Sequence, residues 1–583
     1  MNDYLKKTLN LISLLPTNFY LSFSAYFVLA LVVILFEILA ISFLMPLLTM
    51  LSNNNFDPSQ FSNFINNINN FVIESFSVNI LKDIVTLGIT IFLIFLIKLI
   101  IQFISIWVSA KIAMNAQHFY SLKLYKSYLN KEYFFHLKNG PAKLFRNTMI
   151  EVNSFTSSIL FQSLTLLVEI CILIAIFTFA FLVEPKIMIV IFSMFVIVLV
   201  LFLITKKIVK AQGKIRVKYD EKRISDVQNS FEAIKDVIIY NISNIFYQSF
   251  SIKNRIINLA NFFIRIFSSL PRLLLELSVV LVLLISVIFF SGPDEGNGLE
   301  TIGLFLIVAF RALPGIAKLS STIQTFIFLK PSLDILNVEF FKNTKGVKKT
   351  NNHYSKILFE KNIELSNVSF FFNQKEKLIN KLSIKIKKNS KTGIVGESGS
   401  GKSTLVHLIL GLLDPKKGKI KIDGITLKKS DKINWRTRIG YVGQKIALIN
   451  GGVKENIILD KDYDKKKFHK IIKACSLESF IKKRINDVNL KSNIAAKISG
   501  GEAQRLGLAR ALYQQPEILI MDESTNAIDK VNEQKILRYI YSLKSITLIF
   551  IAHNISALYG CEKIISFHTK GKANLILNKL QKK

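Results

Sequence analysis

Residues 392–404 read Thr-Gly-Ile-Val-Gly-Glu-Ser-Gly-Ser-Gly-Lys-Ser-Thr, and this stretch indicates which class of domain the C-terminal half of the chain forms. An apolar strand runs into a glycine-rich turn, and an apolar helix is expected to follow over 404–412. Glycines at this spacing let backbone N–H groups surround a phosphate, while Lys402 neutralises charge and the Ser403 hydroxyl is placed to bind Mg²⁺. The stretch predicts a phosphate-binding loop of Gly396, Glu397, Ser398, Gly399, Ser400, Gly401, Lys402, Ser403 and Thr404.

A second apolar strand, residues 518–521, ends in two consecutive acids. At the end of a strand beside a phosphate-binding loop, one carboxylate can reach the metal ion and the next the terminal phosphate. Asp522 is therefore the expected Mg²⁺ ligand, and Glu523 is expected to polarise the attacking water. An ordinary acidic strand end is the alternative, and the phosphate-binding loop in the same half disfavours it.

The N-terminal half is dominated by six apolar stretches, each long enough to cross about 30 Å of hydrocarbon. They lie near 21–50, 84–109, 158–183, 186–205, 262–291 and 301–329. After Pro331 the pattern changes to short β-branched runs alternating with helical segments, which predicts an α/β domain. The expected division is a transmembrane domain over 1–335, a linker over 336–354 and a nucleotide-binding domain over 355–583.

The segment before the first apolar stretch, residues 3–15, places Leu5, Leu9 and Ile12 on one helical face and stops at Pro16. This pattern suits a helix that lies on the membrane surface. A cleaved signal peptide is the alternative, but the apolar segment is too long and no small-residue cleavage site follows it.

The short loops predict the orientation in the membrane. Segments 110–157 and 206–261 are rich in Lys and Arg, whereas 292–300 has acids and no base, so the basic loops and both termini should be cytoplasmic. Loop 51–83 is then external. Its apolar residues recur at helical spacing and predict a short amphipathic helix that either packs on the protein or contacts substrate: Phe61, Phe64, Ile65, Ile68 and Phe71.

The composition excludes several classes of protein. The 583 residues carry 76 Lys and Arg against 40 Asp and Glu, a formal charge of +36, and half are hydrophobic; disorder and a small disulfide scaffold are thereby excluded. The Lys, Asn, Ile and Phe content is typical of AT-rich genomes, so a solvated surface attracted to anionic lipid is favoured over nucleic-acid binding. Cys171, Cys475 and Cys561 are expected to be core thiols in a reducing compartment.

Between the two predicted strands lies Ile498-Ser499-Gly500-Gly501-Glu502-Ala503-Gln504-Arg505, which resembles the signature of ABC proteins. With this motif the chain resembles an ABC exporter over essentially its whole length. The resemblance implies a helical membrane domain of six transmembrane helices followed by an α/β P-loop NTPase domain that hydrolyses ATP with Mg²⁺.

The resemblance also assigns roles to single residues. Phe372 falls where the family stacks an aromatic side chain on adenine. Gln444 matches the glutamine that joins the metal and the attacking water, and His553 matches the histidine that senses the γ-phosphate. In the family, the signature closes on ATP held by the opposite domain, which here implicates Ser499, Gly500, Gly501 and Glu502. Asn526-Ala527-Ile528-Asp529 matches the D-loop of the family, which implicates Asp529.

Three departures from the family pattern stand out. Phe372 lacks the usual tyrosine hydroxyl, Glu502 replaces the commoner glutamine, and residues 487–496 lack the Gly-Glu-Arg-Gly pattern that is frequent ahead of the signature. Because the chain has one P-loop and one signature, a complete site needs a second copy, which implies a homodimer. The expected location is the bacterial inner membrane, with the nucleotide-binding domain cytoplasmic.

Ionisable residues inside apolar segments are costly and need individual explanations. Arg272 and Glu276 are four apart on one helical face and could neutralise each other, whereas Arg311 has no helical neighbour of opposite sign. Arg311 either contacts an anionic group in a cavity or pairs with Glu37 or another buried acid. The full set is Glu37, Lys98, Glu169, Arg272, Glu276 and Arg311.

The membrane half resembles exporters of lipid-linked saccharides, in particular the bacterial flippase of polyprenyl-diphosphate oligosaccharides. The residues that carry this resemblance include Glu37 through Pro46, Pro271-Arg272, Phe310 through Pro314, Tyr133 through Asn147 and Ile234-Lys235-Asp236. A diphosphate head group needs cations, for which Arg272 and Arg311 are the candidates. Peptides, other lipids and drugs are alternative cargoes, because the same scaffold exports them. A regulatory ATPase without transport is disfavoured by the six apolar segments.

Overall fold

The computed structural model describes residues 2–52, 84–183, 187–290, 298–342, 358–372, 377–485, 498–552, 555–568 and 572–577. The chain divides into two compact units. The first comprises Met1–Lys131 and His136–Val347, and the second comprises Glu132–Phe135 and Lys348–Lys583.

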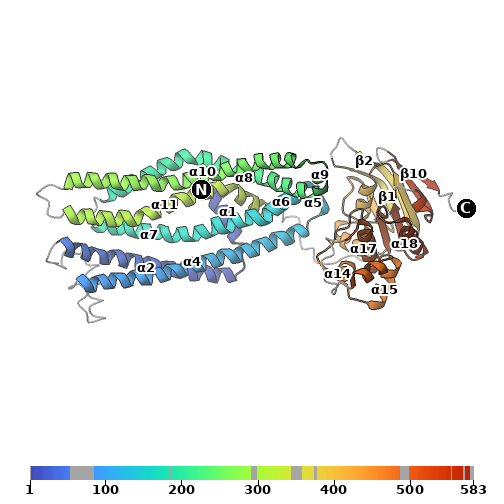
Figure 1. Ribbon diagram of the computed structural model, residues 1–583, viewed down its shortest axis with the longest axis horizontal. Helices are drawn as coiled ribbons and strands as arrows, with labels where there is room; N and C mark the ends of the chain where they lie inside the picture. The colour runs from blue at the N-terminus through green and yellow to red at the C-terminus, as the bar shows by residue number, and fades with distance from the viewer. Residues whose placement is uncertain are drawn as a thin grey trace. The chain divides into compact units, whose positions relative to one another are not determined.

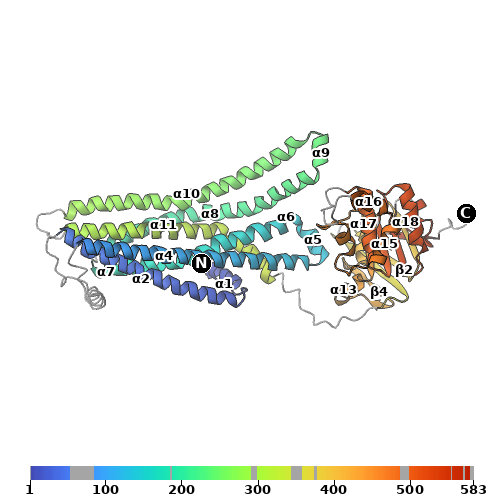
Figure 2. The same cartoon turned by 60° about the horizontal axis from the view of Figure 1, so that its bottom comes forward.

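Within the described residues, six long helices build the first unit, and each covers most of one of the six predicted apolar segments (Figures 1 and 2). Four regions within the described residues are long and apolar enough to cross a membrane: Asn18–Ala40, Gly88–Leu129, Pro141–Thr178 and Val308–Phe341. The presence of six spans stays a prediction. The helices are α2 (Asn18–Ser52), α4 (Ile84–Leu129), α7 (Phe161–Val183), α8 (Ile187–Glu232), α10 (Ser243–Phe290) and α11 (Gly298–Asn337).

Large apolar side chains cover the outer surface of these helices. Leu21 on α2, Phe92 and Leu99 on α4, and Leu273 on α10 are all exposed. Helices that are apolar on all faces are stable where the solvent is hydrocarbon. At about 1.5 Å per residue, the 46 residues of α4 span about 70 Å, so this helix extends well beyond one bilayer core.

The first short helix confirms one prediction. Helix α1 (Asn2–Ile12) forms where the N-terminal amphipathic pattern predicted it. Its Leu11 is fully buried, and the Tyr120 hydroxyl of α4 donates a hydrogen bond of 2.6 Å to the Leu11 carbonyl. Leu5 and Leu9 are exposed on the other side. The helix therefore has one face on the protein and one that is free to meet lipid, and its position on the membrane surface stays a prediction.

Two π-helical segments precede α7 and hold a buried ionic cluster. They are η2 (Arg146–Glu151) and η3 (Ser154–Leu160). Glu151 accepts a hydrogen bond of 3.0 Å from Arg216 of α8, and Arg216 also donates to the Ser332 hydroxyl of α11 at 2.6 Å. A Cβ on Gly213 would lie 2.1 Å from the Phe328 carbonyl oxygen, so only glycine allows α8 this close to α11. The remaining short helices are α5 (Tyr133–Asn139), α6 (Pro141–Phe145), α9 (Ile234–Ile239) and η4 (Val338–Lys342).

The second unit is built on a six-stranded sheet in the order β10-β9-β3-β8-β7-β6. All neighbours pair in parallel except β10 and β9, which are antiparallel. The strands are β3 (Lys391–Gly396), β6 (Ile439–Val442), β7 (Ile518–Asp522), β8 (Thr547–Ile551), β9 (Lys563–His568) and β10 (Lys572–Leu577).

Smaller elements surround this sheet. An antiparallel sheet has the order β2-β1-β4-β5, with β1 (Asn362–Phe371), β2 (Lys377–Lys387), β4 (Lys417–Ile422) and β5 (Ile425–Thr426). The helices are α12 (Lys402–Ile409), α13 (Lys432–Arg436), α14 (Val453–Ile458), α15 (Lys465–Ala474), α16 (Glu478–Ile485), α17 (Gly500–Tyr513) and α18 (Lys530–Ser542), and the 3₁₀ turns are η6 (Lys429–Asp431) and η8 (Ile555–Leu558).

Strand β7 lies between two hydrophobic cores because its side chains alternate between faces. Leu519 and Met521 pack in the core formed with α15, α17 and α18, whereas Ile518 and Ile520 pack in the core formed with α12 and the antiparallel sheet. The parallel sheet is thus covered on both sides, as parallel sheets usually are. The α/β fold predicted for this half is confirmed.

The cysteines correct one prediction. Cys475 and Cys561 are buried, and burial raises the pKa of their thiols to about 12 and about 11. Cys171 is exposed on α7 and is not a core thiol. Because α7 is apolar all round, the sequence does not distinguish its buried side from its outer side.

Several predicted features lie outside the described residues. They are the external helix around Phe61–Phe71, the acidic loop at 292–297, the loop at 487–496 and His553. The predicted linker, 336–354, begins within helical structure, because α11 ends at Asn337 and η4 continues to Lys342.

Candidate functional site

The predicted phosphate-binding residues gather at the carboxyl edge of the parallel sheet. Strand β8 lies between β3, which ends in the glycine-rich loop, and β7, which ends in Asp522. Strand β6, which leads to Gln444, is the next neighbour of β7. Ligands of α/β sheets bind at this edge because the loops that follow the strands meet there.

The glycine-rich loop has the geometry of an anion-binding turn. Gly399 and Gly401 have φ angles of +78° and +103°, which side chains other than glycine rarely tolerate. A Cβ on Gly396 would lie 2.5 Å from the Phe567 carbonyl oxygen. The Lys402 ammonium donates hydrogen bonds to the carbonyls of Gly396 at 2.6 Å and Glu397 at 2.8 Å. The lysine charge is therefore held inside the loop, at the N-terminus of α12.

Asp522 and Ser403 provide two oxygen ligands that fit Mg²⁺. Burial and the neighbouring Glu523 charge raise the pKa of Asp522, while the Lys402 charge and a hydrogen bond from Ser403 act in the opposite direction. A buried carboxylate with excess negative charge nearby favours a divalent cation. Magnesium characteristically takes one or two protein oxygens and completes its shell with phosphates and water, so the predicted pair Ser403 and Asp522 suits it.

Glu523 is held at the end of β7 in a strained backbone conformation. Its φ is +50°, and its N–H donates a hydrogen bond of 3.0 Å to the Ile551 carbonyl of β8. Gln444 Nε2 donates a hydrogen bond of 3.0 Å to Glu523 Oε2. The structure thus brings Gln444 to the predicted catalytic carboxylate, and its contact with a metal ion stays a prediction.

The signature residues begin helix α17 and form its cap. Ser499 Oγ accepts a hydrogen bond from the Glu502 N–H at 3.3 Å, and Glu502 Oε2 accepts from the Ser499 N–H at 2.8 Å. This reciprocal arrangement is a capping box, and it satisfies donors that a helix terminus otherwise leaves unpaired. Ser499 and Gly500 are exposed and Gly501 is half-buried, so this end of α17 is accessible to a ligand.

The loop after Glu523 is fixed on the first turns of α17. The buried Gln504 side chain accepts a hydrogen bond of 3.1 Å from the Ala527 N–H. A Cβ on Gly501 would lie 2.6 Å from the Ala527 carbonyl oxygen. Asp529 ends the loop and caps α18 by accepting from the Asn532 N–H at 3.1 Å. Gln504, which belongs to the quoted signature stretch, was not among the predicted site residues, but it holds the loop after Glu523 in place.

Gly501→Ala is expected to destabilise the second unit, because the new Cβ requires the Ala527 carbonyl to move. Such overpacking costs about 1–3 kcal/mol in free energy of unfolding. Gly500→Ala is the matched control, since its Cβ would meet only the Ala527 Cβ at an ordinary 3.6 Å. Thermal unfolding of the purified protein should show a lower midpoint for Gly501→Ala alone, and equal midpoints would contradict the close approach.

Phe372 is placed to present its ring at the surface. The side chain is 49% exposed, and its ring lies edge-on to Phe370 with centroids 5.1 Å apart. The ring also stacks on Phe134 with centroids 6.5 Å apart, so the predicted stacking of Phe372 on adenine stays a prediction. His553 lies outside the described residues, so its predicted role as γ-phosphate sensor stays a prediction.

In the first unit, Arg311 pairs with Glu37, one of the two alternatives that its sequence context left open. Arg311 Nε contacts Glu37 Oε1, and Arg311 Nη2 donates to Glu37 Oε2 at 2.6 Å. Lys98 Nζ lies 2.8 Å from the same Oε2, and Glu37 is only 1% exposed. Two cations therefore share one buried carboxylate. The resulting cluster of Glu37, Lys98 and Arg311 joins α2, α4 and α11 and carries one net positive charge.

The other predicted substrate cation is also paired. Arg272 Nε donates a hydrogen bond of 2.9 Å to Glu276 on α10, so the predicted mutual neutralisation is confirmed. Lys318 Nζ of α11 lies 3.3 Å from Glu169 Oε2 of α7. Glu169 was named among the ionisable residues of the apolar segments, but its pairing with Lys318 was not predicted. A lysine inside an apolar segment was its signal.

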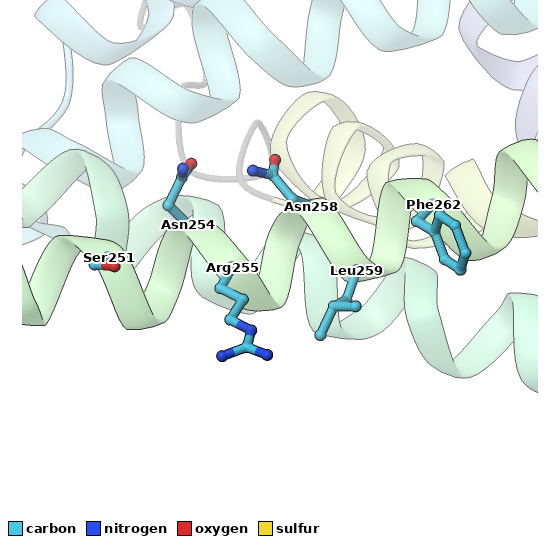
Figure 3. A pocket seen from close by; sticks show the side chains of 6 residues that line it. All are labelled: Ser251, Asn254, Arg255, Asn258, Leu259 and Phe262. Carbon is cyan, nitrogen blue, oxygen red and sulfur yellow. The ribbon is translucent and has the colours of Figure 1, made fainter.

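A surface groove of about 420 Å³ runs along α10. Figure 3 shows that Asn254 and Asn258 point to one side of this helix, whereas Arg255 and Leu259 point to the other. Asn254 Oδ1 accepts a hydrogen bond of 2.9 Å from Arg223 of α8. Neither Arg272 nor Arg311 lines the groove, so the groove and the predicted substrate cations are different places in the unit.

Comparisons with known proteins agree with this architecture. Residues 23–310 match the ABC transporter transmembrane region, and residues 379–526 match the ABC transporter family. The lactococcin-G-processing and transport ATP-binding protein LagD of Lactococcus lactis subsp. lactis is 35% identical over 223 residues, which are 37% of this chain and 31% of that protein. The ATP-dependent permease MDL1 of Candida albicans is 32% identical over 231 residues, 38% of this chain and 34% of that protein.

The chain thus spans about a third of the length of these relatives. A likeness over the whole length comes from a solved structure, described as a bacterial Atm1-family ABC exporter with ATP bound. It has a TM-score of 0.74, covers 94% of each chain and is 18% identical, so it shows a shared fold. The chain therefore has the fold of an ABC exporter, with a helical transmembrane domain followed by an ABC ATPase domain.

Proposed function

We propose that the chain is one half of an ATP-driven exporter that hydrolyses ATP and carries its cargo across a membrane. The observation that carries this proposal is the joint placement of Lys402, Asp522 and Glu523 at one edge of the parallel sheet. The same chain supplies long helices with apolar surfaces. Hydrolysis and membrane passage would thus be coupled within one polypeptide.

Each site residue has a separate proposed role in ATP binding and hydrolysis. The glycine-rich loop and Lys402 bind the β- and γ-phosphates, and Ser403 and Asp522 hold Mg²⁺, which when bound neutralises phosphate charge. Glu523 polarises the attacking water, and Gln444 orients the Glu523 carboxylate through its 3.0 Å hydrogen bond. Phe372 stacks on adenine, and His553 contacts the γ-phosphate.

We further infer a homodimer, because one chain contains one glycine-rich loop and one signature. Ser499, Gly500, Gly501 and Glu502 of one copy would close on ATP held by the other, with Asp529 at the same interface. Closure and reopening would turn the helices between two states, which is how alternating access uses hydrolysis. The proposed location is the inner membrane of a bacterium, with the ATPase domain cytoplasmic.

For the cargo we propose a polyprenyl-diphosphate-linked oligosaccharide. Its support is the resemblance of the membrane half and the net positive charge of the Glu37, Lys98 and Arg311 cluster. Arg311 already donates hydrogen bonds to Glu37, and Arg272 donates one to Glu276. A diphosphate would have to compete with these carboxylates for the two arginine side chains. A peptide is the second candidate, because the relative LagD is described as a lactococcin-G-processing and transport protein.

The test uses purified protein in proteoliposomes with a fluorescent lipid-linked oligosaccharide in one leaflet. ATP-dependent loss of the label from that leaflet, absent with Glu523→Gln, is the expected result. ATP hydrolysis without movement of the label would contradict the saccharide cargo, whereas the proposal of an ATP-driven exporter would stand. The peptide alternative is then tested in the same vesicles with a labelled cationic peptide.

A further inference from the structure

The signature of this chain contains a carboxylate, Glu502, where the family more often has glutamine. The Glu502 side chain folds back over the first turn of α17. Its Oε2 accepts two hydrogen bonds of 2.8 Å, one from the Ser499 N–H and one from the Ser499 hydroxyl. One carboxylate oxygen thus receives two donors of the signature serine.

The serine hydroxyl has a single proton, so it serves one acceptor at a time. Ser499 is exposed at the N-terminus of α17, where backbone N–H groups and the helix dipole favour an anion. In the proposed dimer, the terminal phosphate of ATP held by the second copy arrives at this helix end. Glu502 and that phosphate would then compete as acceptors for the one Ser499 hydroxyl proton. Because both are negatively charged, they would also repel each other.

We propose that Glu502 is an internal anion that occupies the Ser499 hydroxyl until ATP on the second copy displaces it. Glu502 thereby sets the ATP concentration at which two copies close. The inference rests on the proposed function, because the competing phosphate belongs to ATP bound by the other copy. With glutamine in place of Glu502, the phosphate would reach the Ser499 hydroxyl without having to displace a negative charge.

A structural role as helix cap is the competing explanation, and Glu502→Gln separates the two. Glutamine serves equally well in a capping box, so the helix cap survives while the charge is lost. The capping explanation predicts no change in ATP dependence. The anion explanation predicts a lower half-saturating ATP concentration while the helix cap stays intact.

The experiment measures ATP hydrolysis by the full chain in nanodiscs as a function of ATP concentration. For Glu502→Gln, we expect the half-saturating ATP concentration to fall by roughly three- to tenfold, as for the loss of one partly screened like-charge contact. The thermal midpoint should fall only slightly, because the helix cap stays and only the favourable interaction of one charge with the helix dipole is lost. The difference from wild type should shrink at high salt, because added salt screens exposed charges.

Glu478→Gln is the matched control, because Glu478 is an exposed acid in the first turn of α16 and the change removes the same charge. An equal fall in the control would assign the effect to net charge and overturn the proposal. An unchanged half-saturating concentration in Glu502→Gln, with active wild type, would overturn this inference alone. Wild-type protein without ATP hydrolysis would overturn the proposed function and this inference together.

Discussion

Glu523→Gln is expected to abolish ATP hydrolysis while ATP still binds. The amide keeps the size of the side chain and can still accept the hydrogen bond from Gln444, but it cannot take a proton from the attacking water. Loss of a general base lowers kcat by about 10²- to 10⁴-fold. The measurement is phosphate release at saturating ATP, together with binding of a fluorescent ATP analogue.

Glu562→Gln provides the control, because Glu562 is an exposed acid in the turn before β9 and lies outside the site. It should hydrolyse ATP at the wild-type rate. If Glu523→Gln retained more than a tenth of the wild-type rate, water activation would have to come from another residue. The most direct candidate would then be Asp522, the carboxylate next in the chain.

Glu37→Gln is expected to destabilise the membrane unit strongly, because it leaves Lys98 and Arg311 without their shared counter-charge. Removal of one partner from a buried ion pair typically costs about 3–5 kcal/mol. The cost arises from two desolvated cations that repel each other, since Glu37 is buried and contacts both. The measurement is the thermal midpoint and the folded yield of the full chain in detergent.

Two further variants show whether charge causes the effect. The triple replacement of Glu37, Lys98 and Arg311 by leucine removes all three charges, and we expect it to recover most of the lost stability. Asp3→Asn makes the same carboxylate-to-amide change at an exposed acid that contacts Lys7 and Lys330, and it should lower the midpoint far less than Glu37→Gln. Equal stability of Glu37→Gln and wild type would contradict a buried three-residue cluster.

The motifs of the ATP site could be predicted because each is short and local. The loop from Gly396 to Thr404 and the pair Asp522 and Glu523 are read directly from neighbouring residues, and the parallel sheet then brings them to one edge. The cap formed by Ser499 and Glu502 is also local, since Ser-x-x-Glu before a helix is a known pattern. The effect that we propose for Glu502 on ATP use depends on the observed hydrogen bond from the Ser499 hydroxyl, which the pattern alone does not predict.

Pairings between distant residues could not be predicted from the sequence. Arg311 and Glu37 are 274 residues apart, and several acids in apolar segments could have served as the partner of Arg311. Gln504 meets Ala527 only because the loop after β7 packs on α17. Periodicity likewise did not show the π-helical turns of η2 and η3, because segments of six and seven residues are too short for their period to be told from that of an α-helix.

The burial of two of the three cysteines makes this protein a convenient template for site-specific spectroscopy. Only the thiolate reacts with maleimides and methanethiosulfonates, and the raised pKa of Cys475 and Cys561 leaves almost none at neutral pH. Replacement of Cys171 alone would therefore remove nearly all labelling of the native cysteines. A single cysteine introduced at exposed Tyr240 would then place one spin label on each copy of the proposed dimer. The single distance between the two labels would report directly whether nucleotide brings the two halves together.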